Sequence, residues 1–120
     1  MKPHPRGAEW EQRAERYLQA NGLATLERNF HCRLGELDLV MRDDDTTVFV
    51  EVRYRRGDGH GGGLGSITAA KRLKIIRAAG IFLSRRPRLA RGPCRFDVVA
   101  IGGDASRPRY EWVRAAFDAI

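Results

Sequence analysis

Apolar residues first recur with the period of an α-helix, between about Gly7 and Asn21. At spacings of i, i+4, i+7 and i+8, the apolar positions are Trp10, Ala14, Tyr17 and Leu18. This spacing places the four side chains on one face, and the Asn21-Gly22 pair that follows is typical of a helix end. The segment is therefore predicted to be an amphipathic helix.

The next segments change to the two-residue period and the β-branched composition of strands. The three predicted strands cover Thr25–His31, Glu36–Arg42 and Thr47–Arg55, with Gly35 before the second and a turn at Asp43-Asp44-Asp45 before the third. Short connections of this kind favour antiparallel neighbours. We expect a β-meander.

A second helix is predicted after the glycine-rich segment Gly57–Gly65, with Ser66 as its N-cap. Its expected buried stripe consists of Ala69, Leu73, Ile76, Gly80 and Leu83. Phe96–Ile101 then reads as a buried strand, which after a helix is expected to join the sheet in parallel. The tail, Tyr110–Ile120, reads as a short strand or a helix that packs Trp112, Val113 and Phe117.

This order of elements indicates an α/β protein with one central mixed β-sheet flanked by helices. The 120 residues suffice for one domain with a real core, so residues 1–120 are predicted to form a single domain. The N-terminus lacks the apolar run of a secretory signal, no segment is apolar enough to span a membrane, and the two cysteines do not form a metal-binding pair. A cytoplasmic protein is expected.

Glu51 stands out because it is a carboxylate in the middle of the apolar run Val48–Val52. A buried carboxylate is costly unless a cation or strong hydrogen-bond donors compensate it. Alternation places Glu51, Arg53 and Arg55 on one face of this strand. In the preceding strand it places Glu36 and Asp38 on one face and Leu37 and Leu39 on the other. Two partners for Glu51 remain open, a structural ion pair with Arg53 or another arginine and a divalent metal held together with Asp38.

At these residues the sequence resembles the YraN-like bacterial proteins, relatives of the archaeal Holliday-junction resolvases in the PD-(D/E)XK nuclease superfamily. The motifs that carry the resemblance are Gly7…Glu11…Ala14…Leu18…Gly22, Arg28-Asn29-Phe30, Gly35-Glu36-Leu37-Asp38-Leu39, Phe49-Val50-Glu51-Val52-Arg53-Tyr54-Arg55, Lys71 and Arg95-Phe96-Asp97-Val98-Val99. The resemblance implies a restriction-endonuclease-like fold. It also implies that Asp38 and Glu51 bind Mg²⁺ or Mn²⁺, with Glu11 approaching from the first helix. Spacing places Glu11 at the edge of that helix's buried stripe.

The resemblance implies metal-dependent hydrolysis of DNA phosphodiester bonds, at branched or damaged DNA, with Glu11, Asp38, Glu51 and Arg53 as catalytic residues. Arg53 stands where the superfamily most often has lysine. Arginine supplies fixed charge and donors to phosphate but does not exchange protons near neutrality. Lys71 is a candidate substitute from the second helix, and a solvated helix residue is the alternative. Because resolvases act as dimers, a homodimer is compatible with the resemblance.

Basic residues concentrate in one part of the chain. Between Arg53 and Arg95 there are 12 Lys or Arg against the single acid Asp58, giving +11, whereas the remaining residues carry −4 of the net +7. The expected nucleic-acid contacts are Arg55, Arg56, Lys71, Lys74 and Arg77. Such contacts favour phosphate backbones without choosing a sequence, so DNA is the expected partner and RNA an alternative.

Several alternatives remain open. A catalytically inactive nucleic-acid-binding module, a basic protein-interaction domain and a merely solvated arginine-rich surface fit the same charge distribution. Asp97 either reaches the acidic cleft or pairs with Arg95, and Glu36 is either a further metal-side acid or an ordinary polar residue. His60 is either a base or a solvated loop residue.

Overall fold

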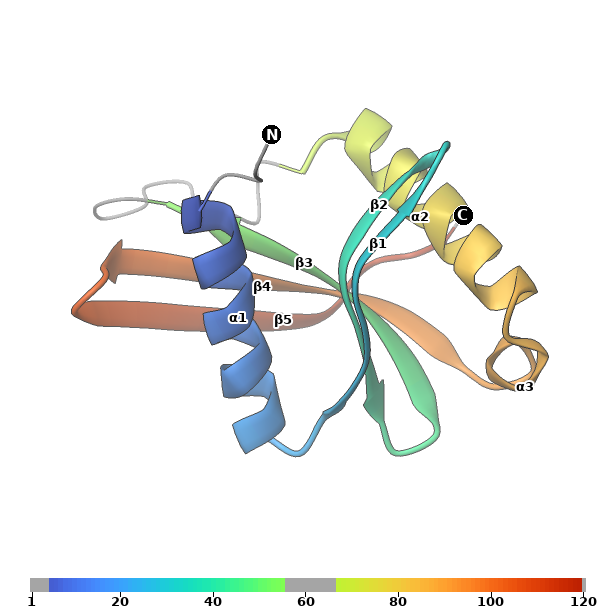
Figure 1. Cartoon of the computed structure of the whole chain (residues 1–120), viewed down its shortest axis with the longest axis horizontal. Coiled ribbons are helices and arrows are strands. Elements are labelled where there is room, and N and C mark those ends of the chain that lie inside the picture. The colour runs from blue at the N-terminus through green and yellow to red at the C-terminus, as the bar shows by residue number, and fades with distance from the viewer. Residues whose placement is uncertain (1–4, 56–66, 120) are drawn as a thin grey trace.

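The computed structural model describes residues 5–55 and 67–119, which form three helices and a five-stranded sheet in the order β1-β2-β3-β4-β5 (Figure 1). The helices are α1 (Pro5–Ala20), α2 (Ala69–Ser84) and α3 (Pro87–Ala90). The strands are β1 (Ala24–Cys32), β2 (Gly35–Asp43), β3 (Thr46–Tyr54), β4 (Cys94–Asp104) and β5 (Arg107–Phe117). The predicted mixed sheet with flanking helices is confirmed, and no described helix has the length and apolar character needed to cross a bilayer.

The sheet combines an antiparallel meander with one parallel pairing. β1, β2 and β3 pair antiparallel, β4 joins β3 in parallel with Glu51 opposite Val98, and β5 returns antiparallel to β4. The meander and the parallel strand are therefore confirmed. The tail is a full strand rather than a helix, because it closes the other edge of the sheet against β4.

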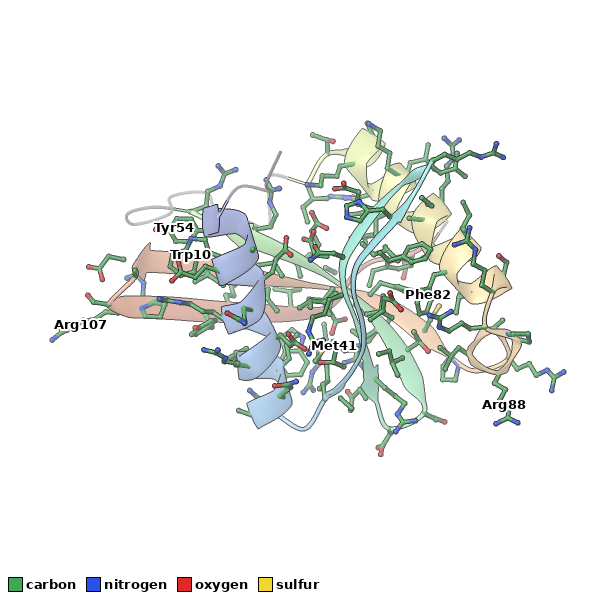
Figure 2. The ribbon with its side chains drawn as sticks, viewed as in Figure 1. Trp10, Met41, Tyr54, Phe82, Arg88 and Arg107 are labelled. Carbon is green, nitrogen blue, oxygen red and sulfur yellow. The ribbon has the colours of Figure 1, made fainter. Side chains whose placement is uncertain are left out.

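Helices cover both faces of the sheet, and each face has its own core. On one face, Trp10, Ala14 and Leu18 of α1 pack against apolar residues of β2, β3 and β4. Trp10 also stacks on Tyr54 with ring centroids 4.0 Å apart, as Figure 2 shows. The predicted face of the first helix is thus confirmed, and α1 is fixed close to the end of β3.

The buried face of α2 differs from the predicted stripe. Its buried residues are Ile75, Ala78, Ala79 and Phe82, whereas Leu73 is 45% exposed. Two apolar rows run along this helix, and the row that contains Phe82 faces the sheet because its ring packs edge-on against Phe30 and Phe49. The predicted cap is also wrong: Thr68, not Ser66, accepts the N–H of Lys71, and Ser66 lies outside the described residues.

Asp97 resolves one of the open alternatives. It is fully buried on β4 and accepts hydrogen bonds from Arg95, from the Trp112 indole and from the backbone N–H of Ala115. Arg95 in turn contacts Asp43 at the end of β2. Asp97 therefore pairs with Arg95 and fastens β5 to β4 where the register of the two strands shifts.

We expect Asp97→Ala to lower the free energy of unfolding by about 3–5 kcal/mol, because Arg95 and the Trp112 indole lose a buried partner. Asp97→Asn, which keeps one acceptor oxygen, should lose less. Urea denaturation followed by circular dichroism measures both, with the exposed Asp118→Ala as the control. A loss of under about 1 kcal/mol for Asp97→Ala would contradict this role.

Candidate active site

A cleft opens between the β1–β2 hairpin, β3 and the first turns of α2. Its volume is about 410 Å³, and it is lined by Gly35, Glu36, Asp38, Glu51, Thr68, Ala70, Lys71, Lys74 and Ile75. Gly35 allows the hairpin to approach the helix, because a Cβ at this position would lie 2.8 Å from the carbonyl oxygen of Lys74. Acids from two strands and lysines from one helix therefore share the same space.

Asp38 lies where β2 and β3 separate. Their pairing extends from Asp43 to Leu39, and just beyond it the N–H of Val52 donates to Asp38 Oδ2 at 2.9 Å instead of to a β2 carbonyl. On the other side of β2, the pairing with β1 runs from Arg28 to Phe30 and skips Asn29, whose backbone has a positive φ of 50°. The side chain of Asp38 thus fills the gap between two strands that no longer pair.

The expected alternation of β2 fails at this point. Leu37 belongs to the core under α2, and Leu39 belongs to the core under α1, so the two leucines do not share a face. The strict period of two holds only while a strand stays regularly paired on both sides. The irregular backbone at Asn29 and the loss of β3 pairing at Asp38 interrupt it.

Glu51 is 5% exposed, and its cation comes from α2. Lys71 Nζ lies 2.8 Å from Glu51 Oε2, with 44% of the lysine side chain exposed. An ion-pair partner for Glu51 is thus supplied by Lys71, because the helix after β3 begins over the carboxylate. Arg53 itself lies two residues further along β3 and is half-buried.

The two carboxyl groups strongly influence each other. The pKa of Glu51 is raised to about 7, first by burial and then by the charge of Asp38, while Lys71 opposes both. Burial also raises the pKa of Asp38, against the hydrogen bonds from Val52 and Glu51. Protonated Glu51 donates to Asp38, so the pair shares a proton near neutral pH.

Glu11 lines a second pocket, also of about 410 Å³, between α1 and β1. The pKa of Glu11 is raised to about 7, mainly by burial and also by the charges of Asp38 and Glu36. Glu11 is therefore close enough to experience the charges of the cleft. Across the described residues, no group of three or more His, Cys, Asp or Glu side chains is arranged to hold one metal ion. Asp38 and Glu51 share the cleft, whereas Glu11 lines the separate pocket between α1 and β1.

Sequence reasoning missed Glu15, one turn after Glu11 on α1. It is buried and receives hydrogen bonds from Arg28 and Thr25 on β1. Burial alone would raise the pKa of Glu15, but these hydrogen bonds outweigh it and lower the pKa. The i−3 spacing of Glu15 from Leu18 was the available signal, since it places the carboxylate beside the buried stripe.

The predicted nucleic-acid contacts lie in and around the cleft. Lys71 and Lys74 line it, Arg77 is exposed one turn further along α2, and Arg55 is exposed just after β3. Arg56 and His60 lie outside the described residues, as does the segment Gly57–Gly65. Glu36 lines the cleft and contacts His31 at 2.9 Å, on the exposed side of the hairpin.

Fold and cleft together define an α/β protein with a pair of carboxyls, one buried and one half-buried, beside a basic helix. The chain belongs to the family described as uncharacterised protein family UPF0102, whose model matches residues 10–101. It is similar to a UPF0102 protein of Pseudomonas fluorescens strain Pf-5, 53% identical over 114 residues that cover 94% of this chain and 93% of the relative. A UPF0102 protein of Pseudomonas aeruginosa strain LESB58 is 51% identical over 116 residues, covering 95% and 93%. The predicted family is thereby confirmed.

The crowded acids predict an unusual pH dependence. In the folded protein the pKa values of Glu11 and Glu51 rise from 4.5 to about 7, so between these values the folded state holds more protons than the unfolded chain. Stability should therefore fall as the pH rises from about 4.5 to about 7. Calorimetric melting in metal-free buffer measures this fall, which Glu51→Gln should reduce.

Glu111→Gln on β5 is the matched control, because this residue is exposed and outside the cleft. It should leave the pH profile unchanged. If the stability profiles of wild type and Glu51→Gln run parallel from pH 4.5 to 7, the raised pKa of Glu51 does not cause the pH dependence of stability.

Proposed function

We propose that this protein is a metal-dependent endonuclease that hydrolyses DNA phosphodiester bonds, on a fold of the restriction-endonuclease-like, PD-(D/E)XK type. The observation that carries the proposal is the pair of carboxyls formed by the half-buried Asp38 and the buried Glu51, which hydrogen-bond to each other in an open cleft. Burying two acids side by side costs free energy that a purely structural site would avoid. A cation between them offsets that cost.

The residues present fit Mg²⁺ or Mn²⁺. Mg²⁺ prefers oxygen ligands and is held in many phosphate-processing sites by one or two carboxylates, with water and substrate phosphate completing its shell. Asp38 and Glu51 supply these carboxylates, and the cleft has room for a phosphate group. When bound, the ion would polarise the scissile phosphate and lower the pKa of an attacking water.

The chain's own residues divide the remaining tasks. The Val52 N–H holds the Asp38 carboxylate in one orientation. Lys71 Nζ neutralises Glu51 when no metal ion is bound. When a metal ion takes its place at Glu51, Lys71 can bind a phosphate oxygen. Lys74 adds a second positive charge on the same wall of the cleft. Glu11, with a pKa of about 7, can accept a proton at its carboxylate near neutral pH.

Lys71 also resolves the chemical difficulty that Arg53 presents. The lysine that the superfamily most often carries on the strand is replaced by arginine, which keeps its proton. The helix supplies an ammonium group in contact with the same carboxylate, 2.8 Å from Glu51. We therefore assign the lysine role to Lys71 and leave Arg53 with fixed positive charge. Branched or damaged DNA is the proposed substrate class, and a homodimer would cut two strands symmetrically.

The contact between Lys71 and Glu51 also favours a second candidate function. A carboxylate neutralised by its own lysine needs no metal, so the same surface would serve a nucleic-acid-binding module without catalysis. The two candidates differ in whether the cleft takes up a divalent ion, and that difference is measurable.

We expect calorimetric titration at pH 7.5 to show Mg²⁺ and Mn²⁺ binding that Asp38→Asn and Glu51→Gln each reduce at least 10-fold, since each variant removes a charged ligand. Lys71→Ala should tighten binding, because the lysine competes with the ion for Glu51. The same variants are then screened for cleavage of duplex, single-stranded and junction DNA. Asp38→Asn and Glu51→Gln should abolish cleavage.

Glu111→Gln controls for the loss of one negative charge and should bind metal as the wild type does. If the wild type binds neither ion at millimolar concentration, with or without junction DNA, the nuclease proposal fails. Nucleic-acid affinity that persists under those conditions would support the binding module instead.

A further inference from the structure

Four arginines surround the corner at which α2 passes into α3, at the opposite end of α2 from the cleft (Figure 1). They are Arg85, Arg86, Arg88 and Arg91, and with Pro87 and Leu89 they line an open hollow of about 650 Å³. Arg85, Arg88 and Arg91 are exposed, and Arg86 is half-buried. The site described above uses none of them.

Three of these arginines have no acidic partner within the described part of the chain. Of the four, only Arg86 forms an ion pair there, with Glu27 on β1 at 2.9 Å. Two of the four guanidinium groups also lie over aromatic rings. Arg85 lies over Phe30, 5.7 Å from the ring centroid, and Arg86 lies over Phe82, at 4.5 Å. Stacking orders a guanidinium and leaves its in-plane N–H donors available to an anion.

The arginine corner is continuous with the basic wall of the cleft. Lys74 and Arg85 are eleven residues apart, which is three turns, so they lie on the same flank of α2 about 16 Å apart along its axis. Arg77 is exposed between them. We call Lys74, Arg77, Arg85, Arg88 and Arg91 the α2–α3 strip. No ion pair within the described ranges involves any of its members.

We propose that the α2–α3 strip binds the phosphate backbone of duplex DNA outside the cleft, about five base pairs from the phosphate that the cleft engages. The inference rests on the proposed function, because the cleft fixes one end of the duplex. Arginine forks bind phosphate oxygens in pairs, and positive groups spread over about 16 Å from Lys74 to Arg85 match a backbone that stays extended over that distance, as the backbone of a stiff duplex does. The acidic turn at Asp44 and Asp45, which borders Leu89, limits the strip on one side.

The test measures DNA affinity with EDTA present, so that binding is separated from cleavage. The strip variant is Arg88→Ala with Arg91→Ala, and the matched control is Arg107→Ala with Arg109→Ala. Both remove two exposed arginines, and Figure 2 shows Arg88 and Arg107 at opposite ends of the molecule. Melting temperatures establish that both variants are folded.

By fluorescence anisotropy with labelled junction DNA, the strip variant should bind at least 10-fold more weakly than the wild type, and the control within 2-fold. The slope of log affinity against log salt should fall by about two for the strip variant, one unit for each lost phosphate contact. The defect should vanish when the arms are cut to three base pairs, because such arms end before they reach the strip.

Equal losses in the two variants would overturn the proposal, since binding would then follow net charge alone. Unchanged DNA affinity in the strip variant would overturn the proposal too, and would favour an acidic protein as the partner of these arginines. A wild type that binds DNA through the strip but never cleaves it with Mg²⁺ would overturn the nuclease proposal and keep the strip. If the wild type cleaves while the strip variant binds normally, only the strip is wrong.

Discussion

The structure depends on two carboxyl groups, the half-buried Asp38 and the buried Glu51, that meet where β2 and β3 separate. Each carboxyl group loses hydration on burial, which raises its pKa, and the charge of Asp38 raises the pKa of Glu51 further. The chain meets part of the cost with one backbone N–H, from Val52, and one ammonium, from Lys71. The proposed divalent cation would offset the cost that remains, and the open cleft gives such an ion access from solvent.

The surrounding architecture holds this centre in place from both faces of the sheet. α1 brings Glu11 alongside and is anchored through Trp10 on Tyr54 and through Glu15 on Arg28. α2 brings Lys71 over Glu51, and the glycine at position 35 lets the hairpin close against that helix. The same helix then carries positive charge away from the cleft toward α3. One element thus both neutralises the acids and extends a surface suited to phosphate.

Much of the fold could be predicted from local patterns. The periodicity of the first helix, the meander and the parallel β4 each followed from spacing and composition, because these elements are regular and one face of each is clearly apolar. The pattern failed on α2, where two apolar rows overlap and only the packing of Phe82 against Phe30 and Phe49 selects one. It failed on β2 because a positive φ at Asn29 and the side-chain hydrogen bond at Asp38 interrupt the alternation.

The candidate site shows the same division. Asp38 and Glu51 could be chosen in advance, since a carboxylate inside an apolar strand calls for a partner. That Lys71 contacts Glu51 depends on where α2 begins relative to β3, which spacing does not specify. Glu15 escaped notice because its compensation comes from Arg28 and Thr25, residues on another element.

The most direct test of the account is a crystal structure grown with Mn²⁺ near pH 7.5, with anomalous scattering recorded for manganese. The account predicts an anomalous peak between the carboxylates of Asp38 and Glu51, with Lys71 Nζ moved away from Glu51. A structure in which Lys71 still contacts Glu51, with no peak in the cleft at millimolar Mn²⁺, would contradict it.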